Sequence, residues 1–283
     1  MLHYAAALQL FGVTTFQAWM APAALRAELH VSLRRLTLIC AWVTVGSGVL
    51  WLMAMAGSLG KGWPDTVNPT VIGTVLTATG FGKVWTIRLL VMALLVLAVT
   101  VLRGPGGWRW LDLLSILTLG SLGFIGHAAA EGGLIGGLHQ TSQVLHLLGS
   151  GFWVGSLLPL VLCLRAMRSE ALMGDADIAL RRFSGLGHFA VAIALGSGVA
   201  NSWFILRNAE IDATVPYQAL LLAKVLIVVV MIGIALVNRY VFVPRIPNDG
   251  PGLRQLRDGT IAEIVLTGAI VVIVGILGVL PPS

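Results

Sequence analysis

Side chains that could bind a metal ion stand near the ends of long apolar segments of this chain. Four of the six histidines do so: His3, His127, His139 and His146. His139 and His146 are seven residues apart, a spacing that returns to nearly the same face of a helix. Glu131 follows His127 at the fourth position. Such a carboxylate could give Cu(II) an oxygen ligand or fix the tautomer of a ligating histidine.

Two methionines add soft ligands to this set. Met53 and Met55 fall at the end of the second apolar segment. Imidazole together with thioether suits copper, especially Cu(I), better than hard ions such as Mg²⁺ or Ca²⁺. A helix would place these two thioethers about 200° apart, so they cannot both face one site. The residue types predict a copper site, as Cu(I) or Cu(II), whose candidate ligands are His3, His127, His139, His146, Met53, Met55 and Glu131.

The composition indicates the kind of element that must position these ligands. Only 11% of the 283 residues are charged, 57% are apolar and the mean hydropathy is +0.92. Soluble domains carry about a quarter charged residues. This contrast excludes a soluble domain, a disordered chain and a nucleic-acid-binding module, so no nucleic-acid partner is expected despite the net charge of +6. Two cysteines inside apolar runs provide no disulfide framework.

Eight segments are long and apolar enough to cross a bilayer, which takes roughly 20 residues. The sequence therefore predicts an all-α bundle of eight transmembrane helices that forms a single integral membrane domain over 1–283, with the lipid bilayer as its partner. We expect 64–81 to be an interfacial or re-entrant loop, because Pro69 and Gly73 interrupt it. The eight predicted spans are about 2–22, 36–56, 83–102, 110–129, 139–164, 183–205, 217–238 and 261–280.

The basic residues predict the orientation. Thirteen of the 18 lysines and arginines follow the odd-numbered spans, against three in the opposite loops. Because cytoplasmic loops are rich in lysine and arginine, both termini should face the periplasm. The candidate ligands then fall in the periplasmic third of the membrane. Segment 2–22 has neither the basic start nor the small-residue cleavage pattern of a signal peptide, so we expect it to remain as the first span.

Landmarks recur in the same order in the two halves of the chain. We infer a duplication, with repeat 1 at about 1–130 and repeat 2 at about 138–283. Each repeat would hold four spans, so the halves should be related by an axis along the membrane normal. This places His3 and His146 in equivalent positions. The matching landmarks are Leu2-His3-x8-Gly12 with Leu145-His146-x8-Gly155, Gly46-Ser47-Gly48 with Gly196-Ser197-Gly198, Phe81-x6-Arg88 with Tyr217-x6-Lys224, and Asp112 with Glu263.

Two runs resemble a known family. Thr79-Gly80-Phe81-Gly82-x-x-Trp85-x-x-Arg88 and His146-x6-Trp153-Val154-Gly155, with the histidine-rich ends, are similar to the copper resistance protein D family. The resemblance covers essentially the whole chain. It implies an eight-span protein of the bacterial inner membrane that handles copper and is commonly proposed to carry it from periplasm to cytoplasm. It also implies a periplasmic copper donor of the CopC type, which we expect to be a separate protein.

The favoured function is a copper transporter of the inner membrane, not an enzyme, with no catalytic residue. The sequence has no Walker motif or phosphorylation run, so we expect transport to be passive, gradient-coupled or dependent on donor and acceptor proteins. One alternative is a haem-binding electron carrier with His3 and His146, or His127 and His139, as axial pairs. Another is a copper sensor or assembly module that binds the ion without moving it.

Overall fold

The computed structural model describes residues 1–102, 104–126, 132–246 and 250–281, and within these ranges it is helical without strands. This confirms the predicted all-α class. The α-helices are α1 Leu2–Thr15, α2 Ala23–Leu59, α3 Pro69–Ala78, α4 Gly80–Val101, α5 Trp108–Gly120, α6 Gly133–Gly155, α7 Leu157–Ala166, α8 Glu170–Leu206, α9 Pro216–Val237 and α10 Gly250–Leu277. Two π-helices extend α1 and α9: η1 Phe16–Met20 and η6 Asn238–Phe242.

Six helical segments of the described residues are long and apolar enough to cross a membrane. They are Ala23–Leu59, Gly80–Val101, Gly133–Ala166, Glu170–Leu206, Pro216–Arg245 and Gly252–Leu277. The predicted spans 2–22 and 110–129 correspond to shorter α-helices. The first is α1, which continues only as the π-helix η1; the second is α5, which gives way to a 3-10 turn over Ser121–Phe124. The count of eight spans therefore stays a prediction.

The segment predicted as a loop at 64–81 is largely helical, so that expectation was wrong. A short 3-10 helix, Trp63–Val67, leads into α3. Asn68 caps α3 by accepting a hydrogen bond from the Thr70 amide at 3.1 Å, and Pro69 occupies the first turn, where its missing N–H costs nothing. The ten residues of α3 are too few to span a bilayer.

α1 lies at the centre of the bundle and packs against α2, α5 and α6. Its crossing with α6 is built on two glycines, because a Cβ on Gly12 would overlap the backbone of Gly155. Hydrogen bonds on both sides hold the crossing: Gln9 Nε2 donates to the Gly155 carbonyl at 2.7 Å, and Ser156 Oγ donates to the Gly12 carbonyl at 3.2 Å. Small residues permit this close backbone contact between membrane helices.

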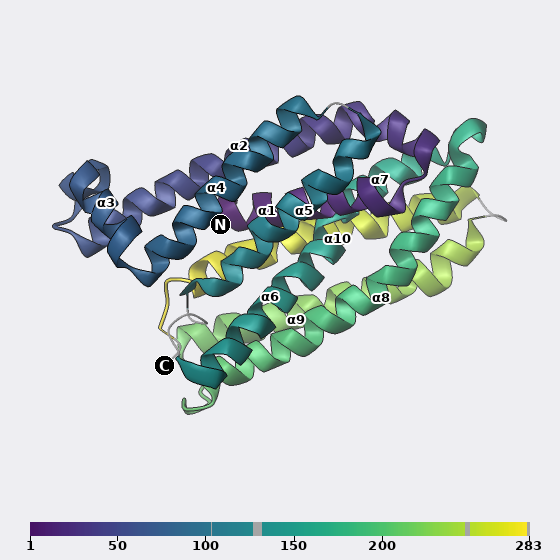
Figure 1. The fold of residues 1–283 in the computed structure, drawn as a ribbon. Helices are drawn as coiled ribbons and strands as arrows, with labels where there is room; N and C mark the ends of the chain where they lie inside the picture. Colours follow the sequence, from purple (N-terminus) through teal and green to yellow (C-terminus); the bar gives the residue numbers. More distant parts are fainter. Residues whose placement is uncertain (103, 127–131, 247–249, 282–283) are drawn as a thin grey trace.

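The start of α1 and the end of α10 lie at the end of the bundle that also carries α3 (Figure 1). At the opposite end the chain turns from α7 into α8, and α2 and α8 both begin there (Figure 1). At 37 residues each, α2 and α8 are about 55 Å long. They exceed the roughly 30 Å hydrocarbon core, so part of each lies outside it.

Candidate functional site

The His3 ring is held between two helices by both of its nitrogens. Nδ1 lies 3.1 Å from the Thr44 carbonyl oxygen and 3.0 Å from Ser47 Oγ, both on α2. Nε2 lies 2.7 Å from Nη2 of Arg88 on α4. A guanidinium can only donate, so Nε2 accepts and Nδ1 carries the ring proton. His3 is thus a neutral imidazole whose second nitrogen is already occupied by Arg88.

Arg88 is fully buried inside a predicted span. Besides His3, its Nη1 donates to the Thr118 carbonyl at 2.8 Å and to Ser121 Oγ. The guanidinium also stands over the Trp85 ring, 5.2 Å from the centroid. No carboxylate forms an ion pair with Arg88 in the described part of the chain. A buried cation that faces the bundle interior is costly in a membrane, and such residues mark functional sites.

Aromatic rings and one thioether surround His3. The Trp51 and Trp85 rings lie 5.8 and 5.9 Å from it, centroid to centroid. An added Cβ on Gly48 would lie 3.1 Å from Met92 Cε and 3.4 Å from His3 Cε1, so the Met92 thioether and the imidazole meet at this glycine. Sequence reasoning missed Met92; its position four residues after Arg88, on the same helix face, is the signal that could have found it.

His146 repeats half of this arrangement. Its Nδ1 lies 2.8 Å from the Ala194 carbonyl and 3.4 Å from Ser197 Oγ, and its ring lies 3.2 Å from an added Cβ on Gly198. The carbonyl only accepts, so Nδ1 carries a proton. Within the described residues nothing hydrogen-bonds to Nε2 of His146, so this nitrogen keeps a lone pair in the neutral ring.

The other candidate ligands are placed differently. His139 is buried and its ring stacks on Phe204, with centroids 4.9 Å apart and planes 17° apart. Met53 is half-buried, and Met55 packs at the edge of the core that holds Trp51 and Trp85. His127 and Glu131 lie outside the described residues.

The described side chains do not assemble into one metal cluster. Among them no group of three or more His, Cys, Asp or Glu stands close enough to hold an ion. His3 contacts α2 and α4, whereas His146 contacts α8. A single site shared by the predicted ligands therefore stays a prediction, and it now depends on the residues outside the described ranges.

Two carboxyls are also buried, Asp112 of α5 and Glu263 of α10. Asp112 accepts hydrogen bonds from Thr15 Oγ1 at 2.6 Å and from Trp19 Nε1 at 2.7 Å. Glu263 accepts from Trp153 Nε1 at 3.0 Å and from Asn238 Nδ2 at 2.9 Å. The sequence identified both acids as repeat landmarks but assigned them no function. A carboxyl inside an apolar span is costly, and this position is itself an indication of a functional role.

Comparison with known proteins decides the family. Residues 1–137 match the family model described as copper resistance protein D-like, N-terminal domain, and residues 178–277 match the model of copper resistance protein D. The chain is 31% identical to the copper resistance protein D of Pseudomonas syringae pv. tomato, over 99% of this chain and 94% of that protein. This chain belongs to the copper resistance protein D family.

Other relatives of this copper resistance protein D family member are consistent with the assignment. The chain is 34% identical to the inner membrane protein YebZ of Escherichia coli over 88% of its length and 84% of that protein. It is 31% identical to the copper transport protein CutJ of Bacillus subtilis, over 58% of this chain and 31% of that protein. No solved structure matches. The family and the membrane-length helices make this a copper-related membrane protein; none of these names refers to haem.

Proposed function

We propose that this protein carries copper ions across the bacterial inner membrane, from the periplasm to the cytoplasm. The family supports a role in copper handling, and the name of one relative refers to copper transport. The observation on which the proposal rests is the setting of His146. A metal-binding histidine typically donates its second N–H to a carbonyl or carboxylate, which fixes the tautomer and orients the ring. His146 does this with the Ala194 carbonyl.

The two equivalent imidazoles differ in what they can bind. Nε2 of His3 accepts a hydrogen bond from Arg88, so copper cannot bind there while that contact holds. Nε2 of His146 has no such donor among the described residues. We therefore assign copper capture to α6 and the residues just before it, with His146 as the central ligand. His139 on the same helix, and His127 and Glu131 before it, complete the proposed ligand set.

The proposed topology has eight spans in two halves and both termini in the periplasm. It is supported by the arginine pattern and by the ends of the described chain, which lie together at one end of the bundle (Figure 1). The contact of Gly12 with Gly155 also supports it, because equivalent residues touch each other where a two-fold axis passes. Copper would arrive from a separate periplasmic donor of the CopC type.

The test is copper binding and uptake by the purified protein in proteoliposomes. Even the loss of an outer-shell partner costs about 10–100-fold in metal affinity, so His146→Ala should weaken copper binding by at least about tenfold and slow uptake. His188→Ala is the control, because that imidazole is exposed and bonds to Ser184 and Tyr240. His3→Ala should weaken binding less than His146→Ala.

Each alternative has its own result. Copper that binds to the wild-type protein but never enters the lumen would mean a sensor or assembly module. A Soret band in the absorption spectrum of the purified protein would mean haem. Unchanged copper affinity in His146→Ala would refute the ligand assignment.

A further inference from the structure

Glu263 is a buried carboxyl held only by neutral groups. It lies midway along α10, within the membrane-length segment Gly252–Leu277, and is 3% exposed. The indole of Trp153 bonds to one carboxyl oxygen and the amide of Asn238 to the other. Each oxygen has two lone pairs, so each keeps one that a proton could occupy.

Glu263 has no ion-pair partner within the described ranges. Its partner Trp153 belongs to an apolar cluster with Leu157 of α7 and Met231 of α9, and Ile264 of α10, the residue after Glu263, packs against this cluster. None of the charged or titratable groups on the elements packed against α10 forms an ion pair with Glu263 in the described part of the chain. These groups are His139 and His146 of α6, Cys163 and Arg165 of α7, Tyr217 and Lys224 of α9, Arg239 and Tyr240 of η6, and Arg245 of Val243–Arg245.

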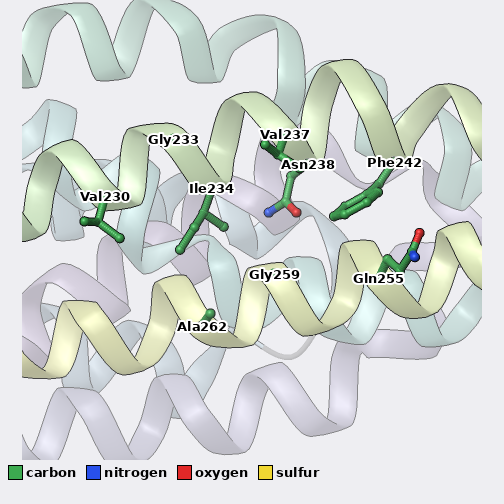
Figure 2. A pocket seen from close by; sticks show the side chains of 9 residues that line it. All are labelled: Val230, Gly233, Ile234, Val237, Asn238, Phe242, Gln255, Gly259 and Ala262. Atoms are coloured by element: carbon green, nitrogen blue, oxygen red, sulfur yellow. The ribbon is translucent and has the colours of Figure 1, made fainter.

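A groove between α9 and α10 leads to the partner of Glu263. It has a volume of about 410 Å³, and its walls include Val230, Gly233, Asn238, Phe242 and Gln255. Figure 2 shows the Asn238 amide pointing from the upper helix toward α10, between the two. Asn238 is 6% exposed, and its Oδ1 has no hydrogen-bond donor among the described residues. The amide therefore bonds to Glu263 with its nitrogen while its oxygen remains an open acceptor.

Gly259 makes this arrangement possible. A Cβ at Gly259 would overlap the Asn238 amide, so a larger residue would push the amide away from α10 and from Glu263. Gly233 lines the same groove, yet an added Cβ there would meet nothing within 4 Å. The two glycines therefore form a matched pair of test positions. A side chain at Gly259 would displace the Asn238 amide, whereas a side chain at Gly233 tests for a general effect of filling the groove.

We propose that Glu263 is a proton-binding site that exchanges protons with water through the α9–α10 groove as copper crosses the membrane. The proton adds to a carboxylate oxygen to give the neutral acid, and it leaves to water when the carboxylate forms again. The coupling of this step to copper rests on the proposed transport function. Ionisable groups inside membrane proteins commonly serve as proton relays, which is the chemistry that this setting suits.

The proton site can be tested without copper. Infrared spectra of the purified protein, recorded as the pH is lowered, should show the C=O stretch of a protonated carboxylic acid. Glu263→Gln should remove this band, and Asp112→Asn should leave it. Gly259→Ala should shift the pH at which the band appears, whereas Gly233→Ala should not. A band that persists in Glu263→Gln, or that disappears only in Asp112→Asn, would overturn the proton site.

The coupling is tested in proteoliposomes that contain a pH-sensitive dye and are supplied with copper. Wild-type protein should change the luminal pH as copper enters, and Glu263→Gln should abolish that change while copper still binds. An identical pH change in Glu263→Gln would overturn the coupling. If the infrared band behaves as expected but wild-type protein takes up no copper, the proton site stands and the transport function fails.

Discussion

The crossing of α1 and α6 gives the sharpest prediction about stability. Gly12→Ala places a methyl group where the backbone of Gly155 already lies. Because the obstacle is main chain, no change of side-chain rotamer can relieve the overlap, and the two helices must separate. Separation would also stretch the hydrogen bonds that Gln9 and Ser156 make across the crossing.

The expected cost follows from the packing. Inserting a methylene-sized group into a well-packed core costs about 1–3 kcal/mol, and a clash with backbone belongs at the upper part of that range. At about 2–4 °C per kcal/mol, a loss of about 2–3 kcal/mol lowers the melting temperature by about 4–12 °C. Gly155→Ala should cost a similar amount, because its added Cβ would overlap the Leu8 carbonyl. In the double variant one separation relieves both clashes, so its cost should be less than the sum.

The assay is thermal unfolding in detergent, followed by tryptophan fluorescence. Gly46→Ala in α2 and Gly196→Ala in α8 are the controls, because an added Cβ at either meets nothing within 4 Å. These controls should melt at or above the wild-type temperature, since alanine favours a helix over glycine. If Gly12→Ala melts like Gly46→Ala, the close backbone contact does not hold these helices together and the reasoning is refuted.

Two further predictions concern side chains. Arg88→Lys should destabilise the protein by about 1–3 kcal/mol, because a single ammonium cannot satisfy the three acceptors that the guanidinium reaches. Thermal unfolding should show this loss of stability. The control is Arg181→Lys at an exposed arginine, which should show none. Hydrogen bonds from the Lys61 amide and the Asn68 side chain lower the pKa of Asp65 below its usual 3.8. The ionised Asp65 carboxylate therefore stabilises the turn before α3 at pH values above 3.8. This stabilisation is lost as the pH falls through the lowered pKa. Hydrogen exchange should show the protection factor of the Lys61 amide falling in acid, and Asp65→Asn should remove this dependence.

The sequence predicted the long elements well, for a physical reason. An unbroken apolar run inside a bilayer must satisfy its backbone within a helix, so runs such as 83–102 and 217–238 predict α4 and α9 within a few residues. The same rule failed at 64–81, where local capping by Asn68 forms a helix too short to be recognised by apolar length. It also overextended 110–129, because α5 ends at Gly120.

The candidate site was less predictable. Periodicity placed His139 and His146 on nearly one face of α6, but it could not show that one would stack on Phe204 and the other bond to a carbonyl of α8. Nor could it show that Arg88 would occupy the second nitrogen of His3. These contacts depend on how separate helices approach each other, and a single sequence holds no direct record of that approach.

The loose packing of α9 has a consequence for the groove beside Asn238. Only 6% of the apolar window of Pro216–Arg245 is buried inside the protein, against 67% for Gly133–Ala166. Most of α9, one of the two helices that form the groove, therefore faces outward from the described protein, where a bilayer would contact it. A thinner or thicker bilayer would tilt this helix before it disturbed the core, because tilting is the usual response to mismatched length. Membrane composition would thereby set how wide the groove opens.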